Sequence, residues 1–600
     1  MKLEFNDYKK RVYGCFLGKS IGGTLGMKYE GDLRYIPDIT YYNPVPTEMV
    51  PNDDLDLQVV NLEILLRTGL PVCRHNIAEM WLDHLEHSCP DEYGVAKSNH
   101  QIGLRAPITG QFRNKFVAGM GGAIRSELWA CLAPANPTLA ATLAREDACT
   151  DHNDDGIYAE MFLAALESAA FVEKDINKLI DIGLSVVDKN CRFYSAICDT
   201  RRVYAETGDM LATREYILKN YRQVSWTYVA INVSFVVLAL LSCEGDFSKA
   251  ICNAVSMGYD ADCTGATIGS IMGIINPDGI EDRWKKPIGD ELVLSCCIIN
   301  MHEWDTIGDF SNAIMSVAYE VQKYYGSDVE IEPCESLPKA KLADPWTDDY
   351  KGLYDWKIGE RESLISVSPF FVNLIYPETI AVIPEKAEKF TLKLYSPKAH
   401  KGALKLFAPE RWSVSPASFE IDVKAGETKY IDFFVTASPG SKRRFLANML
   451  SMRFEVDGVG FTVNAGLPIS LPWQVINEKT GEESVLEAPS IFFKVPAGAY
   501  RYKTRVQANA DMLVRICSQG TRTYTLLVNG EEIRSGNKTT VYCPAFHSGI
   551  TKKPEVLLHQ HQIDEIELIF PDDDDEGEFF LGFSTVYGCA MWINTIGRML

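Results

Sequence analysis

The fold of the N-terminal half follows from the stretch YGCFLGKSIGGTLG at residues 13–26. Its glycines recur at every fourth position, so that in a helix they form one ridge. A second stretch, GYDADCTGATIGSIMG at residues 258–273, carries a similar ridge. The ridge glycines are Gly14, Gly18, Gly22, Gly26, Gly265, Gly269 and Gly273.

Such a ridge needs a packing reason, because glycine destabilises a helix by about 1 kcal/mol per position relative to alanine. Ridges of this spacing pack into one another and let two backbones approach closely. We therefore hypothesise that the two glycine-rich helices pair antiparallel. The alternative is that each ridge faces some other helix.

The periodicity of apolar residues changes near residue 325 from helical spacing to strand-like alternation. It predicts helices over residues 55–66, 155–171, 210–221, 227–241 and 306–324. Beyond an irregular acidic and proline-rich segment, residues 419–423 alternate with period two, and Asn529-Gly530 marks a hairpin turn. We predict an all-α domain at 1–325, a linker at 326–359, an Ig-like β-sandwich at 360–475 and a jelly-roll-like, carbohydrate-binding-like β-sandwich at 476–600.

Composition limits the partners and the compartment. The net charge of −22 disfavours nucleic acid, whose partners carry basic patches. No apolar run reaches the roughly 20 residues of a membrane span, and residues 1–19 lack a signal-peptide core. The 16 cysteines include no Cys-x-x-Cys pair, which is typical of reduced core thiols. The sequence predicts a cytoplasmic protein without nucleic-acid or membrane partners, and leaves the oligomeric state open.

Three acidic clusters each precede a predicted helix, at residues 52–56, 151–156 and 260–264. Helix capping is the simplest explanation of each, but a cap needs one side chain and each cluster supplies several. Carboxylates held together repel one another unless a cation neutralises them, and an oxygen-only ligand set suits Mg²⁺ or Ca²⁺. If the glycine ridges pair antiparallel, Glu30 lies beside Asp260 and Asp262. We predict the metal-binding site at this junction.

Taken in order, these segments resemble the ADP-ribosylglycohydrolase family, also called the dinitrogenase-reductase-activating glycohydrolase family. The resemblance covers roughly residues 8–325, and its motifs are specific as an ordered set. The segments that carry it are residues 13–26 with Glu30, Asn52-Asp53-Asp54, the glycine-rich residues 119–125, His152, and Asp260-Ala261-Asp262.

The resemblance implies a glycosidase with one or two Mg²⁺ ions, in which the metal orients ribose hydroxyls and water. Its implied metal ligands are Asn52, Asp53, Asp54, Asp260, Asp262 and Cys263. Glu30, as ligand or general base, and Asp54 are the implied catalytic residues. Its implied substrate-binding residues are Gly121, Gly122, Arg125, His152 and Asn153.

Two departures from the family pattern bear on the metal. Asn52 replaces the usual threonine, and its amide oxygen can still be a ligand. Cys263 stands where a threonine ligand is expected, and a thiol is a poor partner for Mg²⁺, which leaves the number of ions open. These changes indicate a divergent branch.

Three functions are compatible with this sequence. The first is metal-dependent hydrolysis of the glycosidic bond of an ADP-ribosyl group or related riboside. The second is a furanosidase or nucleoside-type hydrolase that acts on a carbohydrate. The third is an ADP-ribose-binding or sugar-binding protein without turnover. Four aromatic residues of the sandwiches are candidates for sugar stacking, although core packing is the commoner role: Trp473, Tyr500, Tyr502 and Trp592.

Overall fold

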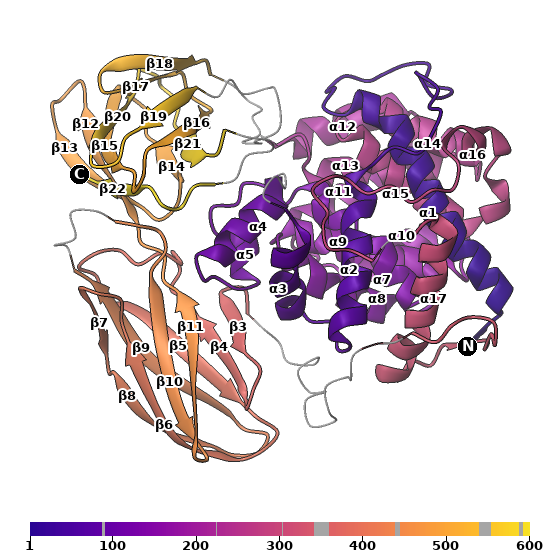
Figure 1. Cartoon of the computed structure of the whole chain (residues 1–600). Coiled ribbons are helices and arrows are strands. Elements are labelled where there is room, and N and C mark those ends of the chain that lie inside the picture. Colours follow the sequence, from indigo (N-terminus) through magenta and orange to yellow (C-terminus); the bar gives the residue numbers. More distant parts are fainter. Residues whose placement is uncertain are drawn as a thin grey trace. The chain divides into compact units, whose positions relative to one another are not determined.

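The computed structural model confirms a helical N-terminal region followed by β-sandwiches (Figure 1). Its contacts divide the chain into two units: Met1–Glu86 with Phe116–Trp346, and His87–Lys115 with Thr347–Leu600. The structure describes residues 1–86, 91–223, 225–302, 304–340, 342, 359–438, 444–538, 554–586 and 592–600. Half of the predicted linker, residues 341 and 343–358, lies outside this set.

The helical unit is built on the predicted antiparallel pair, α1 (Phe5–Gly26) and α15 (Ala261–Ile275). A methyl group placed on Gly18 would lie 2.1 Å from the carbonyl oxygen of Gly269. Gly14 meets Gly273 and Gly22 meets Gly265 in the same way, so the two chains run in opposite directions. The pairing hypothesis is confirmed, and only glycine permits this backbone contact.

The remaining helices of this unit surround the pair. The apolar helix α13 (Val229–Ser242) is buried on nearly every side, as expected for a helix without a polar face. None of the helices described is both long and apolar enough to cross a membrane. The others are α2 (Asp53–Thr68), α3 (Arg74–His84), α6 (Met120–Ala123), α7 (Ser126–Leu132), α8 (Pro137–Ala148), α9 (Asp155–Ala170), α10 (Ile176–Ser185), α11 (Arg192–Thr207), α12 (Met210–Tyr221), α14 (Phe247–Ser256), α16 (Asp282–Ile288) and α17 (Ile307–Tyr324).

The first sandwich has a five-stranded and a four-stranded sheet among the described residues. In spatial order, the first sheet contains β3 (Glu362–Ser366), β4 (Phe371–Ile375), β5 (Glu388–Tyr395), β9 (Thr428–Ala437) and β7 (Trp412–Ser415). The second contains β11 (Val459–Gly466), β10 (Met449–Val456), β6 (His400–Phe407) and β8 (Ser418–Val423). Alternating burial along these strands, as in β9, gives each sheet one inward face.

The second sandwich packs two sheets around one apolar core. One sheet contains β13 (Glu483–Ala488), β12 (Leu471–Asn477), β15 (Tyr500–Gln507), β20 (Asp564–Phe570), β17 (Tyr524–Val528) and β18 (Glu531–Gly536), with β22 (Gly597–Met599) paired to β15. The other contains β14 (Phe492–Val495), β21 (Gly577–Ser584), β16 (Met512–Gly520) and β19 (Glu555–Leu558). The predicted Asn529-Gly530 turn joins β17 to β18, with both residues at positive φ. Trp473 and Tyr502 belong to the core, as their commoner role predicts.

The segment His87–Lys115, with α4 (Asp91–Gln101) and α5 (Ile108–Gln111), groups with the β-sandwiches although it interrupts the helical unit in sequence. The Gly466 amide donates to the Gly103 carbonyl at 2.8 Å. Arg113 Nη1 donates to Asn594 Oδ1 at 2.8 Å, and the Ser363 hydroxyl donates to the Arg105 carbonyl at 2.8 Å. This unit is therefore assembled from two separate parts of the chain.

Candidate functional site

The helix pair places acidic residues at one junction, where α1 ends and α15 begins. A methyl group on Gly26, the last residue of α1, would lie 2.1 Å from the Ala261 carbonyl oxygen. Beyond η1 (Met27–Tyr29), the Gly31 amide donates to the Tyr259 carbonyl and the Tyr259 amide donates to the Asp32 carbonyl, both at 2.8 Å. These two bonds hold the segment after α1 against the segment before α15.

The turn before α15 is irregular, as the convergence of Asp260 and Asp262 requires. Gly258 and Tyr259 both have left-handed backbones, with φ of 69° and 61°. A methyl group on Gly258 would lie within 2.4 Å of the carbonyl oxygens of Asp32 and Arg34, so this position accepts only glycine. The Asp260 side chain does not cap α15, which leaves its carboxylate available at the junction.

The start of α2 forms the opposite wall. Asn52 caps this helix, because its Oδ1 accepts the Asp54 amide at 2.8 Å. Asp54 follows in the first turn and is 1% exposed, whereas Asp53 is exposed. Capping is thus confirmed for Asn52, and its predicted role as a metal ligand stays a prediction.

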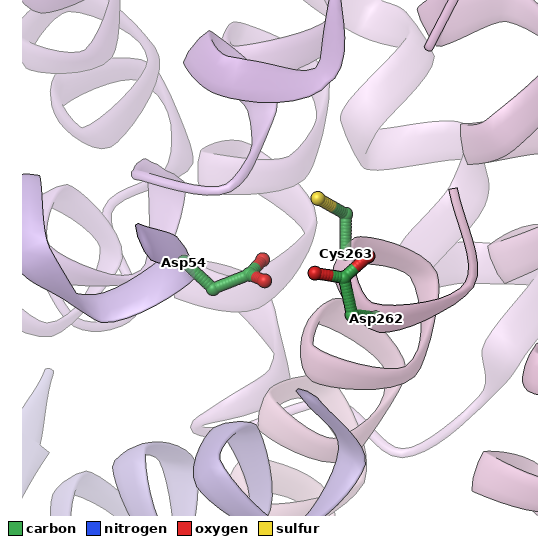
Figure 2. A group of neighbouring side chains, drawn as sticks. All are labelled: Asp54, Asp262 and Cys263. Carbon is green, nitrogen blue, oxygen red and sulfur yellow. The ribbon is translucent and has the colours of Figure 1, made fainter. Parts of the chain in front are cut away.

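Two overlapping groups of donor atoms meet at the junction. Within each group, the ligand atoms lie within 4.8 Å of one another: Glu30, Asp260 and Asp262 in one, and Asp54, Asp262 and Cys263 in the other. Asp262 belongs to both. Figure 2 shows the Asp54 carboxylate pointing across from α2 toward the Asp262 and Cys263 side chains of α15.

Three buried oxygens of this cluster lack a hydrogen-bond donor among the described residues. Both Asp54 carboxylate oxygens and Oδ1 of Asp262 make no hydrogen bond among the described residues. Burial and the neighbouring carboxylates raise the pKa of Asp54 and Asp262 well above the usual range of aspartate. Orphaned, converging carboxylate oxygens are destabilising unless a cation neutralises them, so the residues present fit a divalent metal ion.

A buried lysine lies behind the cluster, and the sequence motifs did not reveal it. Lys19 on α1 is 1% exposed. Its Nζ donates to Glu127 Oε1 at 2.8 Å and lies 3.9 Å from Asp54 Oδ1. Burial lowers the pKa of Lys19, but the carboxylates of Glu127 and Asp54 outweigh it and raise the pKa above its usual value. Gln58 completes the group, because its Nε2 donates to Glu127 Oε2 at 2.9 Å.

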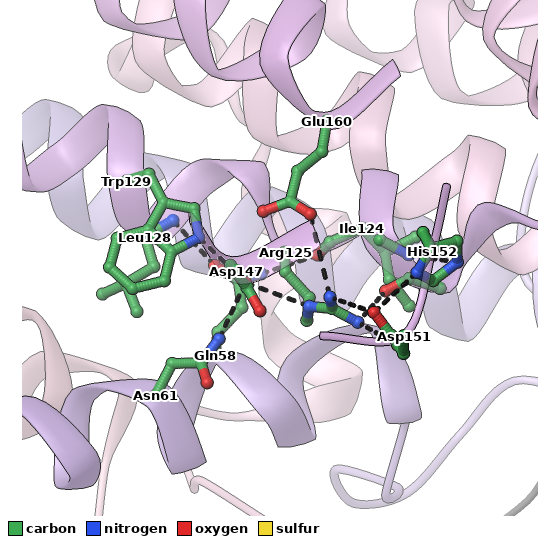
Figure 3. Close-up of polar contacts among 12 residues, drawn as sticks. Gln58, Asn61, Ile124, Arg125, Leu128, Trp129, Asp147, Asp151, His152 and Glu160 are labelled. Atoms are coloured by element: carbon green, nitrogen blue, oxygen red, sulfur yellow. Dashed lines mark hydrogen bonds and ion pairs between the residues drawn. The ribbon is translucent and has the colours of Figure 1, made fainter. Parts of the chain in front are cut away.

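The predicted substrate-binding residues Arg125 and His152 form a separate buried network (Figure 3). Both side chains are 0% exposed. Arg125 donates two hydrogen bonds to Asp151, at 2.8 and 2.9 Å, and one from Nε to Asp147 at 3.0 Å. His152 Nδ1 lies 2.6 Å from Asp151 Oδ1, and its Nε2 accepts the Gly122 amide at 3.1 Å.

This network holds the glycine-rich segment in place, because Arg125 Nη1 also donates to the Gly121 carbonyl at 2.7 Å. Burial raises the pKa of Asp151, but the Arg125 guanidinium and His152 lower it further, so the pKa stays below the usual value of aspartate. The buried Asp151 carboxylate therefore offsets the charge of Arg125. Asn153 is only half-buried, and its main-chain amide donates to the Val117 carbonyl at 2.9 Å. The geometry gives Arg125 and His152 a positioning role, and direct substrate contact stays a prediction.

The sequence model of the family described as ADP-ribosylglycohydrolase matches residues 5–318. A solved structure described as an ADP-ribosylglycohydrolase-related protein complex is 19% identical, with 53% of this chain and 99% of that chain covered and a TM-score of 0.37. An anti-sigma factor domain-containing protein from Clostridium clariflavum is 11% identical, with 35% and 84% covered and a TM-score of 0.17.

The lectin from Pleurotus ostreatus in complex with GalNAc is 13% identical, with 40% of this chain and 86% of that chain covered and a TM-score of 0.13. No curated protein matches the chain. Because the family model spans more than half of its residues, from the start of α1 into α17, the chain belongs to the ADP-ribosylglycohydrolase family.

Proposed function

We propose that this protein is a metal-dependent hydrolase that cleaves the glycosidic bond of an ADP-ribosyl group or a related riboside. Family membership supports a glycohydrolase-type function. The observation that carries the finer proposal is the convergence of Glu30, Asp54, Asp260 and Asp262 at one junction. Buried oxygens of Asp54 and Asp262 accept no hydrogen bond from the described residues.

We propose Mg²⁺, one or two ions, held by Asp54, Asp260 and Asp262, with Asn52 and Asp53 at the edge. The bound cation would supply a Lewis acid for the ribose hydroxyls and for a water molecule. Asp262 is held in place because its helix, α15, contacts the backbone of α1 along the glycine ridge, and Asp54 faces it from the buried side of α2.

Glu30 is the residue that we propose as general base. It is exposed, unlike Asp260 and Asp262 beside it, so a substrate and a water molecule can reach its carboxylate. In hydrolysis, a Glu30 oxygen accepts a proton from the water whose oxygen bonds to the anomeric carbon. The bond to the aglycone breaks, and the aglycone leaves with a proton.

A calorimetric titration of the metal-stripped full chain tests the proposal. We expect Mg²⁺ to bind, ADP-ribose to bind only with Mg²⁺ present, and both to be lost in Asp262→Ala. The control is Asp282→Ala, because Asp282 is an exposed helix residue that forms an ion pair with the exposed Lys286. Unchanged hydrolysis of an ADP-ribosylated substrate by Asp262→Ala would contradict the site.

The same titration separates the alternatives. Mg²⁺ binding without ADP-ribose binding would favour a furanosidase or nucleoside-type hydrolase. ADP-ribose binding without turnover would favour a binding protein. We also propose a cytoplasmic protein without a nucleic-acid partner, supported by the free cysteines of the described residues and the net charge of −22.

A further inference from the structure

One of the two donor groups at the junction contains sulfur. Asp54 and Asp262 contribute carboxylates, and Cys263 contributes a thiol that is 7% exposed. The three side chains come from two facing helices and point into one shared space (Figure 2). The other group, Glu30 with Asp260 and Asp262, contains oxygen ligands alone.

In the sulfur-containing group, the Asp54 and Asp262 carboxylates point into this space, and three of their oxygens are not used in other hydrogen bonds among the described residues. Both oxygens of Asp54 and Oδ1 of Asp262 are buried and have no hydrogen-bond partner in the part of the chain that the structure describes. The nearby ammonium of Lys19 does not satisfy them, because it bonds to Glu127 at 2.8 Å and lies 3.9 Å from Asp54. Lys19 therefore forms its hydrogen bond with Glu127 and only a longer ion pair with Asp54, so both Asp54 oxygens still lack a hydrogen-bond donor among the described residues.

The ligand types of the two groups select different ions. Mg²⁺ and Ca²⁺ take oxygen ligands, whereas Zn²⁺, Co²⁺ and Cd²⁺ bind a thiolate together with carboxylates. In a tetrahedral site, metal–ligand distances of about 2.0–2.3 Å place two ligands of one ion no more than about 3.8 Å apart. Donor atoms that already lie within 4.8 Å of one another need only small side-chain rotations to meet this limit.

We propose that Asp54, Asp262 and Cys263 form a site for a thiophilic divalent cation such as Zn²⁺, next to the all-oxygen group and sharing Asp262 with it. The inference rests on the proposed function, because it assigns chemistry to one half of the same metal centre. On binding, the sulfur–metal bond forms as the thiol releases its proton to solvent. The site thus holds two cations of different chemical character.

Titration of the metal-stripped, reduced full chain with Co²⁺ tests this assignment by absorption. We expect one equivalent of Co²⁺ to produce a thiolate-to-cobalt charge-transfer band in the near ultraviolet. Cys263→Ser removes the band and weakens Co²⁺ binding by at least about 100-fold. Cys296→Ser keeps the band, because that exposed thiol lies outside the group.

Cys263→Thr is the second variant, in case serine perturbs folding. It also loses the band, and it binds Mg²⁺ where the parent binds Co²⁺. A parent protein that binds Co²⁺ without the band, or a band that survives in both Cys263 variants, overturns the proposal. Mg²⁺-dependent hydrolysis without the band would leave the proposed function intact and refute the thiophilic site alone. The band without hydrolysis would support the thiophilic site and contradict the proposed function.

Discussion

Gly18→Ala should destabilise the helical unit, although alanine is the better helix former. Its methyl group would lie 2.1 Å from the Gly269 carbonyl oxygen and 2.7 Å from the carbonyl carbon. Both partners are main-chain atoms, so no side chain can rotate away, and the helices must separate by about 1 Å to reach a normal contact. Overpacking of this kind costs about 3 kcal/mol, against a gain of about 1 kcal/mol in helix propensity. We expect a net loss of about 2 kcal/mol.

The assay is a urea titration of the full chain, followed by the helical signal in circular dichroism. Gly308→Ala is the matched control, since Gly308 lies in α17 and its added methyl group would meet Thr306 Oγ1 at an ordinary 3.5 Å. That variant should keep or raise stability by up to about 1 kcal/mol. If Gly18→Ala is as stable as Gly308→Ala, the close contact between α1 and α15 is wrong.

Three further predictions concern charged groups. Lys19→Met leaves the buried Glu127 carboxylate without its cationic partner. The loss should cost about 3–5 kcal/mol in the same urea titration, and adding Glu127→Gln should recover part of it. Asp151 has a folded-state pKa below its unfolded value, so it stabilises the protein above about pH 4 and this contribution is lost as the pH falls through the folded value. Asp151→Asn should therefore be less stable at pH 7 and show a shallower loss in acid, as measured by thermal unfolding against pH; an unchanged acid limb would exclude this role. Chelation of divalent metal should lower the unfolding temperature of the parent protein and leave that of Asp262→Ala unchanged in calorimetry, because only the parent has the intact cluster.

The sequence predicts those parts of the fold in which a local pattern would destabilise the protein unless a specific partner packs against it. Glycine at every fourth position of a helix is unfavourable unless another backbone fills the space, and the structure shows Gly18 against Gly269. The segment before α15 has more carboxylates than helix capping needs, which predicted a shared metal-binding role. In the structure, the Asp260 side chain does not cap that helix. Both inferences use neighbouring residues and elementary energetics.

The parts that the sequence conceals depend on distant partners. Lys19 is buried next to the site, where it pairs with Glu127 of another helix, and its own sequence segment does not indicate this partner. Arg125 and His152 follow the family motif, but the sequence does not reveal that both are fully buried and that Asp151 contacts both. Exposure arises from the packing of many elements, so a motif predicts that a residue matters without predicting whether it touches the substrate.

The segment His87–Lys115 has a consequence for how the protein is made. Its partners, such as Gly466 for Gly103 and Asn594 for Arg113, lie far toward the C-terminus. At ribosomal speeds of about 5–20 residues per second, Gly466 is synthesised roughly 20 to 70 s after Gly103. During that interval Gly103 and Arg113 lack these hydrogen-bond partners. The unit that contains His87–Lys115 therefore cannot finish folding until Gly466 and Asn594 have been synthesised, long after its first segment.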